Sequence, residues 1–569
     1  MANEVEDKKE NILNPKGLQI IPLGGLGEIG KNMMAIRYNN DIIVIDAGLG
    51  FPSEEHLGVD YIIPNTDYLI ENQKYIKGII LTHAHEDHIG GLNDFLKRFS
   101  LGIPPIFGTK LTLGLVEDKL EYKHICGSVS LRVIETRQKI QIGGSFKIEF
   151  LKVCHSIADS IGLAIETPLG TIIHTGDFKL DPTPLDGKLT DYYKFSEYGE
   201  KGVLLLMSDS TNVTRPGYTP SERDITPTLR NAIGTAEGRV IATTFASNVH
   251  RVQQIINLSA KFNRKVALVG RSMEKISKKA IELGYINPED ATFIRLSEIN
   301  NYPPNEVTII TTGSQGEPMS VLTRIANGIH KIKVMEGDTI ILSAAPIPGN
   351  EKLVSNTVNK LFAKGAEVLY QSHQCLHVSG HASVEELKLM LNITKPKFFV
   401  PVHGEHRHLK HHKDLAETLN IESENIFILN NGDVLEITKE YAEIIGKVPA
   451  GKILVDNSGI GHLEEEILVD RQNLSKDGVI FVSAAFDREL NLMAPPLLNS
   501  KGFIVDEDYE SFYNNGSAFL KEHLENYIND IANRDTINLY RLIKSITDDY
   551  AYSITKRKPL IMAMIHVAH

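Results

Sequence analysis

Short apolar runs separated by turn-forming residues dominate the chain from about Leu18 to Gly217. Runs of this length, bounded by Gly, Pro and Asn, predict β-strands. Several of them end in His or Asp, so we expect chemistry at the C-terminal ends of strands. The clearest runs are IIVIDAG (42–48), GIILTH (78–83), FKIEFLKVCH (146–155), GTIIHTGD (170–177) and GVLLLMSD (202–209).

The pattern changes between about Pro220 and Tyr370, where helical periodicity (about 249–262 and 272–283) alternates with apolar runs such as RVIATTF (239–245) and KVALVG (265–270). This alternation predicts a parallel α/β unit. From His373 the first kind of chemistry returns, in HVSGHAS (377–383) and KFFVPVHGE (397–405). The pattern therefore indicates one domain inserted into another.

These changes of pattern predict the domain boundaries. We expect a flexible lead over 1–17, a host domain in two parts (18–219 and 371–451), an inserted domain over 220–370, a linker over 452–474 and a C-terminal domain over 475–569 that mixes strands and helices.

The composition is that of an ordinary globular protein, with 42% hydrophobic and 23% charged residues. The three cysteines (Cys126, Cys154 and Cys375) argue against a disulfide framework and for a reducing compartment. No apolar run approaches the roughly 18 residues of a membrane span, and residues 1–17 lack the apolar core of a signal peptide. We therefore expect a cytoplasmic protein with no membrane partner. The net charge of −12 argues against a nucleic-acid partner unless a local groove carries bound cations.

The sequence His-Ala-His-Glu-Asp-His at 83–88 is the strongest chemical signal, with four potential metal ligands in six positions: His83, His85, Asp87 and His88. Imidazole nitrogen and carboxylate oxygen are ligands that Zn²⁺ accepts. Four ligands exceed what one ion uses while keeping a position open for water. The motif therefore favours two adjacent metals, an arrangement that hydrolyses phosphoesters or amides, over a solvated His-rich loop.

Further candidate ligands end apolar runs elsewhere: His155, Asp177 and His403, with Asp46 at an equivalent position. A single His or Asp at a strand end is usually structural, but the preceding motif favours metal ligands here. Gly25–Gly30 matches G-x-G-x-x-G and precedes Asp46, as in dinucleotide-binding folds. The residues between them predict a hairpin with an Asn/Asp turn and leave no room for the crossover helix, so we expect a tight loop beneath the metal site.

The motif at His83–His88 resembles the signature of the metallo-β-lactamase superfamily. Eight segments extend the similarity to its β-CASP branch and, within it, to the ribonuclease J family: GGLGEIGKNM (24–33), HAHEDHIGG (83–91), HSIADSIG (155–162), HTGDFKLDPTP (174–184), SDSTN (208–212), TTGSQGEPMS (311–320), HVSGHAS (377–383) and PVHGEHRHL (401–409). The resemblance covers nearly the whole chain. It implies an α/β protein: a metallo-β-lactamase αββα sandwich with an inserted parallel α/β β-CASP domain and a small α/β C-terminal domain.

The resemblance also implies the roles of the site residues. His83, His85 and His155 would hold one Zn²⁺, and Asp87, His88 and His403 a second, with Asp177 bridging them; Mn²⁺ is an alternative occupant. Asp46 would orient a ligand imidazole through a hydrogen bond. Asp209 matches motif A of the family, and His377 or His381 matches motif B. With the ligand Asp87 these form the expected catalytic group, and the sequence does not decide between the two histidines.

For the substrate, the resemblance implies contacts in two segments: Ala246, Ser247 and Asn248, and His377, Val378, Ser379, Gly380 and His381. Both offer small polar side chains and backbone N–H groups suited to a phosphate. Ordinary helix capping is the alternative at Ser247 and Asn248. Arg271 and Arg324 are candidates for RNA backbone contacts or for simple solvation. We expect His406, His408, His411 and His412 to point to solvent and to bind no metal.

The implied activity is that of a zinc-dependent ribonuclease, with 5′-to-3′ exonuclease and endonuclease action on single-stranded RNA through metal-hydroxide attack on the phosphodiester. The resemblance further implies a preference for a 5′-monophosphate, roles in rRNA processing and mRNA decay, a homodimer or homotetramer, and contacts with other RNA-decay proteins. A β-CASP DNA nuclease and a purely endonucleolytic enzyme remain alternatives. The inserted block argues against a small-molecule hydrolase, and the seven ligands argue against an RNA binder that does not cut.

Overall fold

The computed structural model describes residues 16–53, 55–122, 129–288, 292–313, 320–344, 346, 350–370, 376–456, 465–504, 509–530 and 536–568. Nearly all of the predicted lead, Cys126, Cys375, the segment 371–375 and most of 311–320 lie outside the described residues. Cys154 is a buried free thiol. The chain divides into two compact units, one of Met1–Phe51 with Ile62–Ile453 and one of Pro52–Tyr61 with Leu454–His569. The grouping of Pro52–Tyr61 with the C-terminal residues was not expected from the sequence.

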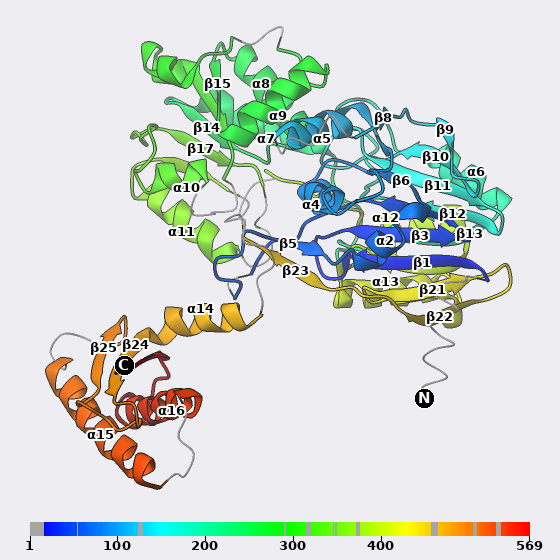
Figure 1. Cartoon of the computed structure of the whole chain (residues 1–569). Coiled ribbons are helices and arrows are strands. Elements are labelled where there is room, and N and C mark those ends of the chain that lie inside the picture. Colours follow the sequence, from blue (N-terminus) through cyan, green and yellow to red (C-terminus); the bar gives the residue numbers. More distant parts are fainter. Residues whose placement is uncertain are drawn as a thin grey trace. The chain divides into compact units, whose positions relative to one another are not determined.

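Two β-sheets form the centre of the first unit (Figure 1). In spatial order, the first sheet contains β22 (Ala442–Lys447), β21 (Asp433–Ile437), β1 (Leu18–Gly24), β3 (Met33–Tyr38), β4 (Asp41–Ile45), β6 (Ile76–Ile80), β7 (Ile106–Gly108) and β8 (Leu131–Val133). The second contains β19 (Pro396–Val402), β13 (Val203–Asp209), β12 (Gly170–His174), β11 (Ile161–Thr167), β10 (Phe146–Lys152) and β9 (Lys139–Ile142). Both sheets combine strands from the two parts of the host domain, 18–219 and 371–451.

Alternating side chains along the strands produce the layers. Ile43 and Ile45 of β4 share a buried cluster with Phe398 of the second sheet, whereas Val44 belongs to a cluster on the outer face with Phe95. The period of two places successive residues on opposite faces, so one strand serves both layers. The outer helices are α2 (Asp67–Glu71), α4 (Leu92–Leu96) and α5 (Lys110–Tyr122) on the first sheet, and α6 (Tyr192–Lys201), α12 (Val384–Thr394) and α13 (His406–Thr418) on the second. The predicted αββα sandwich is confirmed.

The inserted domain is a parallel sheet with helices on both faces, coloured green in Figure 1. Its strands, in spatial order, are β15 (Lys265–Val269), β16 (Val307–Thr311), β14 (Val240–Thr243), β17 (Thr339–Leu342) and β18 (Glu367–Leu369). Its helices are α7 (Thr226–Thr235), α8 (Val249–Lys261), α9 (Arg271–Glu282), α10 (Val321–Ala326) and α11 (Glu351–Phe362). The chain passes from β14 to β15 on one side of it and later from β16 across β14 to β17 on the other side, so the direction of the connections reverses there. Such a switch point opens a crevice at the carboxyl ends of the strands.

The second unit has a three-stranded sheet, in the order β25 (Leu497–Lys501), β24 (Val479–Phe486) and β26 (Leu560–Val567). Ile480 and Val482 of β24 are buried with Leu539 and Ile543 of α16 (Thr536–Thr555), and α15 (Tyr509–Asp530) joins this cluster. The helix α14 (Glu465–Asp477) covers part of the stretch predicted as a linker. Among the described residues, no helix combines the length and apolar composition that a membrane span requires.

Candidate metal centre and active site

The strand ends of the sandwich carry most of the predicted site residues. The strands β12, β13 and β19 are parallel neighbours in one sheet, and β4 and β6 in the other. Their carboxyl ends therefore meet at one edge of the sandwich, where the residues that follow them lie close together. These residues are Asp46 after β4, His83 after β6, Asp177 after β12, Asp209 at the end of β13 and His403 after β19. Asp46 and His403 have positive φ angles of 60° and 53°, which turn the chain sharply at the site.

Asp87 and His88 lie on the single-turn helix α3 (Glu86–Ile89). Backbone hydrogen bonds hold this turn against the loop after β4, with Ala47 N–H donating to His88 O at 2.8 Å. Gly48 has no room for a side chain, because a Cβ there would lie 1.7 Å from Asp87 O. The predicted hairpin is confirmed as β3 and β4, so the G-x-G-x-x-G segment precedes no crossover helix. Gly25 of this segment and the preceding Gly24 instead line a small cavity with His88 and Asp177.

His83, His85 and His155 form one group of candidate ligands. His85 Nδ1 lies 3.1 Å from both His83 Nε2 and His155 Nε2. Burial lowers the pKa of His85 to about 4 and holds the pKa values of His83 and His155 well below their usual range. All three rings are therefore neutral at pH 7, which is the state that binds a metal.

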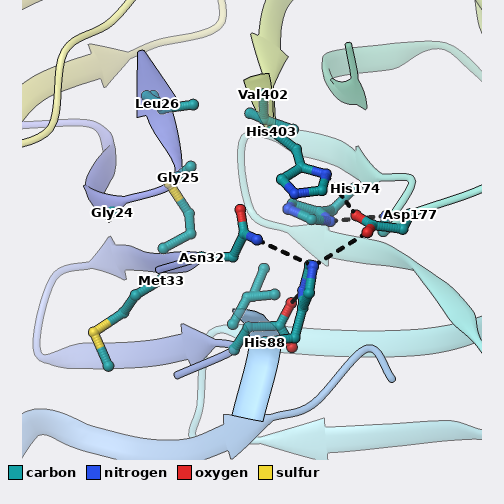
Figure 2. Close-up of a pocket in the computed structure, with 14 residues that line it drawn as sticks. Gly24, Gly25, Leu26, Asn32, Met33, His88, His174, Asp177, Val402 and His403 are labelled. Atoms are coloured by element: carbon teal, nitrogen blue, oxygen red, sulfur yellow. Dashed lines mark hydrogen bonds and ion pairs between the residues drawn. The ribbon is translucent and has the colours of Figure 1, made fainter. Parts of the chain in front are cut away.

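Asp87, His88, Asp177 and His403 form the second group. Figure 2 shows Asp177 facing both His88 and His403, with its Oδ2 3.2 Å from His88 Nε2 and its Oδ1 3.1 Å from His403 Nδ1. Asp177 Oδ2 also lies 3.7 Å from His83 Nε2 in the first group. One carboxylate thus faces both groups, as the predicted bridging position requires.

Charge, as well as burial, sets the protonation of the second group. Burial opposes the charged form of His88, but the carboxylates of Asp177, Asp87 and Asp46 outweigh it and raise its pKa well above the usual value. The pKa of His403 is raised in the same way, chiefly by Asp177. The facing imidazoles in turn hold the pKa values of Asp87 and Asp177 below their usual range.

Asp46 contacts His88 from outside the ligand groups, with 2.7 Å between Asp46 Oδ2 and His88 Nδ1. Thr82 fixes this carboxylate, because its N–H donates to Oδ1 and its hydroxyl to Oδ2, each at 2.8 Å. Because Asp46 contacts Nδ1 of His88, the other nitrogen, Nε2, is directed at Asp177. Carboxylates commonly orient metal-binding imidazoles in this way.

His381 and Asp209 form a pair beside the ligands. His381 Nδ1 lies 2.8 Å from Asp209 Oδ2, while the N–H and hydroxyl of Thr211 donate to Asp209 Oδ1 at 2.9 and 2.7 Å. Burial opposes the charge on His381, but Asp209 outweighs it and raises the pKa of the imidazole. His377 lies in a different environment, where burial and the nearby Arg251 lower its pKa to about 4.

The donor set fits divalent metals. Three imidazole nitrogens lie together here, with His85 Nδ1 3.1 Å from the other two, and each neutral ring can offer a lone pair to a shared cation. The neighbouring group adds two carboxylates and two imidazoles, whose candidate ligand atoms lie within 4.8 Å of one another. Zn²⁺ accepts both ligand types.

Comparison with known proteins identifies the family. Four family models match: "Beta-lactamase superfamily domain" at residues 41–191, "Ribonuclease J, beta-CASP domain" at 237–361, "Zn-dependent metallo-hydrolase RNA specificity domain" at 365–428 and "Ribonuclease J C-terminal domain" at 466–568. A ribonuclease J of Thermus thermophilus is 44% identical over 96% of this chain and 95% of its own length. The chain belongs to the ribonuclease J family. It is a metal-dependent ribonuclease.

Other relatives agree with this assignment. A ribonuclease J of Synechocystis is 49% identical over 86% of this chain and 76% of the relative, and ribonuclease J2 of Bacillus subtilis is 40% identical over 97% and 99%. A solved structure of a protein of unknown function from Enterococcus faecalis shares the fold, with a TM-score of 0.53 and 17% identity over 74% of this chain and all of that one.

In this ribonuclease J chain, one predicted substrate segment directly precedes α8 and the other lies between β18 and α12. Asn248 caps α8, because its side chain accepts from Arg251 N–H at 3.0 Å, so capping accounts for part of its chemistry. Ser379 Oγ accepts from Asn212 at 2.8 Å, and Gly380 O lies 2.8 Å from His155 Nδ1. The segment His377–His381 therefore contacts a candidate metal ligand directly. Ala246 and Val378 are buried, Arg271 is exposed and Arg324 is half-buried.

The histidines of α13 differ in part from expectation. His406 and His411 are exposed as predicted, but the prediction that His408 and His412 point to solvent is wrong, since both are buried. His412 Nδ1 lies 2.9 Å from Ser210 Oγ, and its ring packs on Phe399. One face of the helix packs on the sheet, and these two positions, four residues apart, share that face. None of the four belongs to a ligand group among the described residues.

Sequence reasoning missed the polar residues that hold the site in place: Asn32, Thr82, Thr211 and Asn212. Asn32 Nδ2 lies 3.1 Å from His88 Nε2 (Figure 2). Each lies within or next to a family segment noted from the sequence, and that neighbourhood was the available signal. Apart from the contact of Thr211 with Asp209, these partners are distant in the chain, so only the fold reveals the contacts.

Proposed function

We propose that this ribonuclease degrades single-stranded RNA from the 5′ end, releasing one nucleotide at a time, and also cuts internally, in cytoplasmic RNA maturation and mRNA decay. The observation that carries the proposal is the position of Asp177, whose carboxylate faces both ligand groups. A shared carboxylate between two groups is typical of dinuclear sites that hydrolyse phosphodiesters.

In this proposal, two Zn²⁺ ions occupy the site, with Mn²⁺ as the alternative. One is held by His83, His85 and His155, the other by Asp87, His88 and His403, and Asp177 bridges them. When bound, adjacent divalent ions supply a water-derived nucleophile at neutral pH and neutralise charge on the phosphoryl oxygens. Asp46 keeps the ring of His88 in its ligating orientation.

His381 serves as the general acid. Burial opposes a charge on the ring, but Asp209 raises the pKa of the imidazole and so favours the form with a proton on each nitrogen. Nδ1–H donates to Asp209, which leaves Nε2–H to protonate the 3′-oxygen as the P–O3′ bond breaks. The products are a 3′-hydroxyl on the released nucleotide and a 5′-phosphate on the remaining RNA. Each cut thus regenerates the 5′-monophosphate end that the next cut requires.

Space near the site matches a nucleotide. A cavity of about 780 Å³ is lined by Lys110, Lys188, His250 and Tyr285, among others. A smaller cavity shares Lys188 and His250 with it and reaches His155. The larger volume lies in the range of nucleotide-sized ligands, and its lining combines the two lysines with one carboxylate, Asp186.

The 5′-phosphate is held, on this proposal, by the backbone at the start of α8 with Ala246, Ser247 and Asn248, and by the segment from His377 to His381 that includes Val378, Ser379 and Gly380. The positive end of a helix dipole favours an anion, and the hydroxyl of Ser247 adds a donor at the start of α8. The metallo-β-lactamase domain (18–219 and 371–451) supplies the ligands and the β-CASP domain (220–370) this phosphate contact. The C-terminal domain (475–569) supports a homodimer or homotetramer.

The test uses one RNA sequence with a 5′-monophosphate or a 5′-triphosphate, labelled in its first nucleotide. We expect labelled mononucleotide from the first substrate, much less from the second, and none after chelation. Fragments longer than one nucleotide from both substrates would reject the 5′-to-3′ direction. No cleavage of RNA, with cleavage of single-stranded DNA, would reject the substrate class.

A further inference from the structure

We propose that Arg251 is a positioning residue that couples the β-CASP domain to the acid side of the active site, through the segment Leu376–His381. This inference rests on the proposed function, in which His381 acts on the departing oxygen. Arg251 lies on α8, four residues after Ser247, yet its side chain is 0% exposed. It therefore acts through protein contacts and does not touch RNA.

The guanidinium joins the two connections between the domains. Glu222 lies where the chain first enters the β-CASP domain, and its carboxylate is a buried ion-pair partner of Arg251 Nη2. Leu376 lies where the chain returns, and its carbonyl accepts from Arg251 Nη1 at 3.1 Å. Nη1 also donates to Ser343, which follows β17, and Ser343 Oγ donates to Leu376 O at 2.7 Å. One side chain thus links α8, the end of β17 and both connections between the domains.

The segment after Leu376 carries this restraint to the reaction centre. Gly380 O contacts His155 Nδ1, and His381 contacts Asp209. At the far end, Asn212 Nδ2 donates to His381 O at 3.0 Å and Thr219 Oγ1 to the same atom at 2.7 Å. The segment is therefore anchored at both ends, by the β-CASP domain through Arg251 and by the sandwich through Asn212 and Thr219.

The segment has little freedom to compensate for a lost anchor. A Cβ on Gly380 would lie 2.7 Å from the ring of His155, so the backbone already packs at the closest approach. A lysine cannot replace Arg251, because it lacks the planar fork that reaches Glu222, Ser343 and Leu376 together. Loss of the fork leaves the position of His381 less defined, and small displacements of an acid slow the chemical step far more than they weaken binding.

Arg251→Lys tests the proposal, with Arg239→Lys as a matched control. Arg239 is also buried in the β-CASP domain and pairs with Asp338 at 2.9 and 2.6 Å, but at the opposite ends of β14 and β17. With 5′-monophosphorylated RNA at saturating zinc, we expect Arg251→Lys to lower kcat by at least about tenfold while KM changes by less than about threefold. Arg239→Lys is expected to lower the melting temperature to a similar extent and to keep kcat.

A double-mutant cycle with His381→Ala separates positioning of His381 from a purely structural role of Arg251, because it measures the effect of Arg251→Lys on kcat with and without His381. If Arg251 acts through His381, Arg251→Lys costs less than about twofold in kcat when His381 is already alanine. The proposal would be overturned if the kcat losses of Arg251→Lys and His381→Ala multiplied in the double variant. A wild-type kcat in Arg251→Lys, or a loss of kcat explained by its lower zinc content, would overturn it as well. Should Arg251→Lys not fold, Ser343→Ala, which removes one bond to Leu376 O, takes its place in the same cycle. A wild-type enzyme that cut only internally would reject the 5′-to-3′ direction and leave this test in force, since the departing oxygen is the same.

Discussion

His381 and Asp209 lie 172 residues apart in the chain, and their side chains are 2.8 Å apart in the structure. Asp209 ends β13 and is 1% exposed, whereas the side chain of His381 is 19% exposed. The buried carboxylate thus holds Nδ1 of the imidazole, while part of the ring stays exposed. His377, the alternative from the sequence, lies beside Arg251 and not in this pair.

This difference predicts opposite outcomes for the two histidines. We expect His381→Ala to lower kcat by about 100-fold to 10,000-fold, because a general acid is lost, with little change in KM or zinc content. His377→Ala is the matched control and keeps kcat within about tenfold. Steady-state kinetics on 5′-monophosphorylated RNA measure both. A large loss confined to His377→Ala would show that the roles are reversed.

Asp46 predicts an effect on metal affinity without a ligand being removed. Asp46→Ala frees His88 Nδ1, and we expect zinc to bind the protein about 10-fold to 100-fold more weakly. Glu86→Gln is the control, since Glu86 lies beside the ligands in sequence but is half exposed and pairs with Lys119. Competition with a zinc chelator gives both affinities. Equal affinities in the two variants would contradict the orienting role of Asp46.

Zinc binding is expected to release protons. The raised pKa values of His88 and His403 mean that both rings are protonated in the metal-free protein at pH 7. Zinc must displace these protons, so its apparent affinity rises with pH between about 6 and 8. Calorimetry in buffers of different ionisation enthalpy counts the protons released. A binding enthalpy independent of the buffer would contradict this account.

Gly380 predicts a steric effect on the first ligand group. A Cβ at this position would lie 2.7 Å from His155 Cε1 and Nδ1 and 2.8 Å from Ser156 Oγ. We expect Gly380→Ala to displace His155, to cost about 1–3 kcal/mol of stability and to weaken zinc binding. Gly451→Ala, with no atom within 4 Å of its Cβ, is the neutral control. Thermal unfolding with and without zinc separates the two variants. Equal melting temperatures in both variants would contradict the steric effect and show that the loop around Gly380 shifts to accommodate the methyl group.

The sequence predicted the ligand groups because each ligand has a local signal. His83 to His88 lie in one motif, and His155, Asp177 and His403 each end an apolar run, which is where parallel strands place functional side chains. The inserted parallel α/β domain followed from the change of hydrophobic period, whereas the αββα sandwich followed from the family resemblance.

What the sequence did not reveal depends on packing between distant segments. The burial of His408 and His412 depends on which face of α13 meets the sheet, and a histidine-rich helix carries no clear apolar stripe. The assignment of His381, and not His377, as the partner of Asp209 depends on where the segment Leu376–His381 meets the end of β13. Arg251 follows a predicted substrate segment in the sequence, yet its guanidinium is buried against three other segments of the chain. A charge gives no sequence signal of its burial when its partner is 29 residues away.

The most direct test of the account titrates zinc into metal-free protein while bound metal and turnover of 5′-monophosphorylated RNA are measured together. We expect each chain to bind two zinc ions and turnover to appear only as the second site fills. We expect Asp177→Asn to abolish this turnover. Full turnover with a single bound zinc, or turnover unaffected by Asp177→Asn, would contradict a dinuclear site bridged by Asp177.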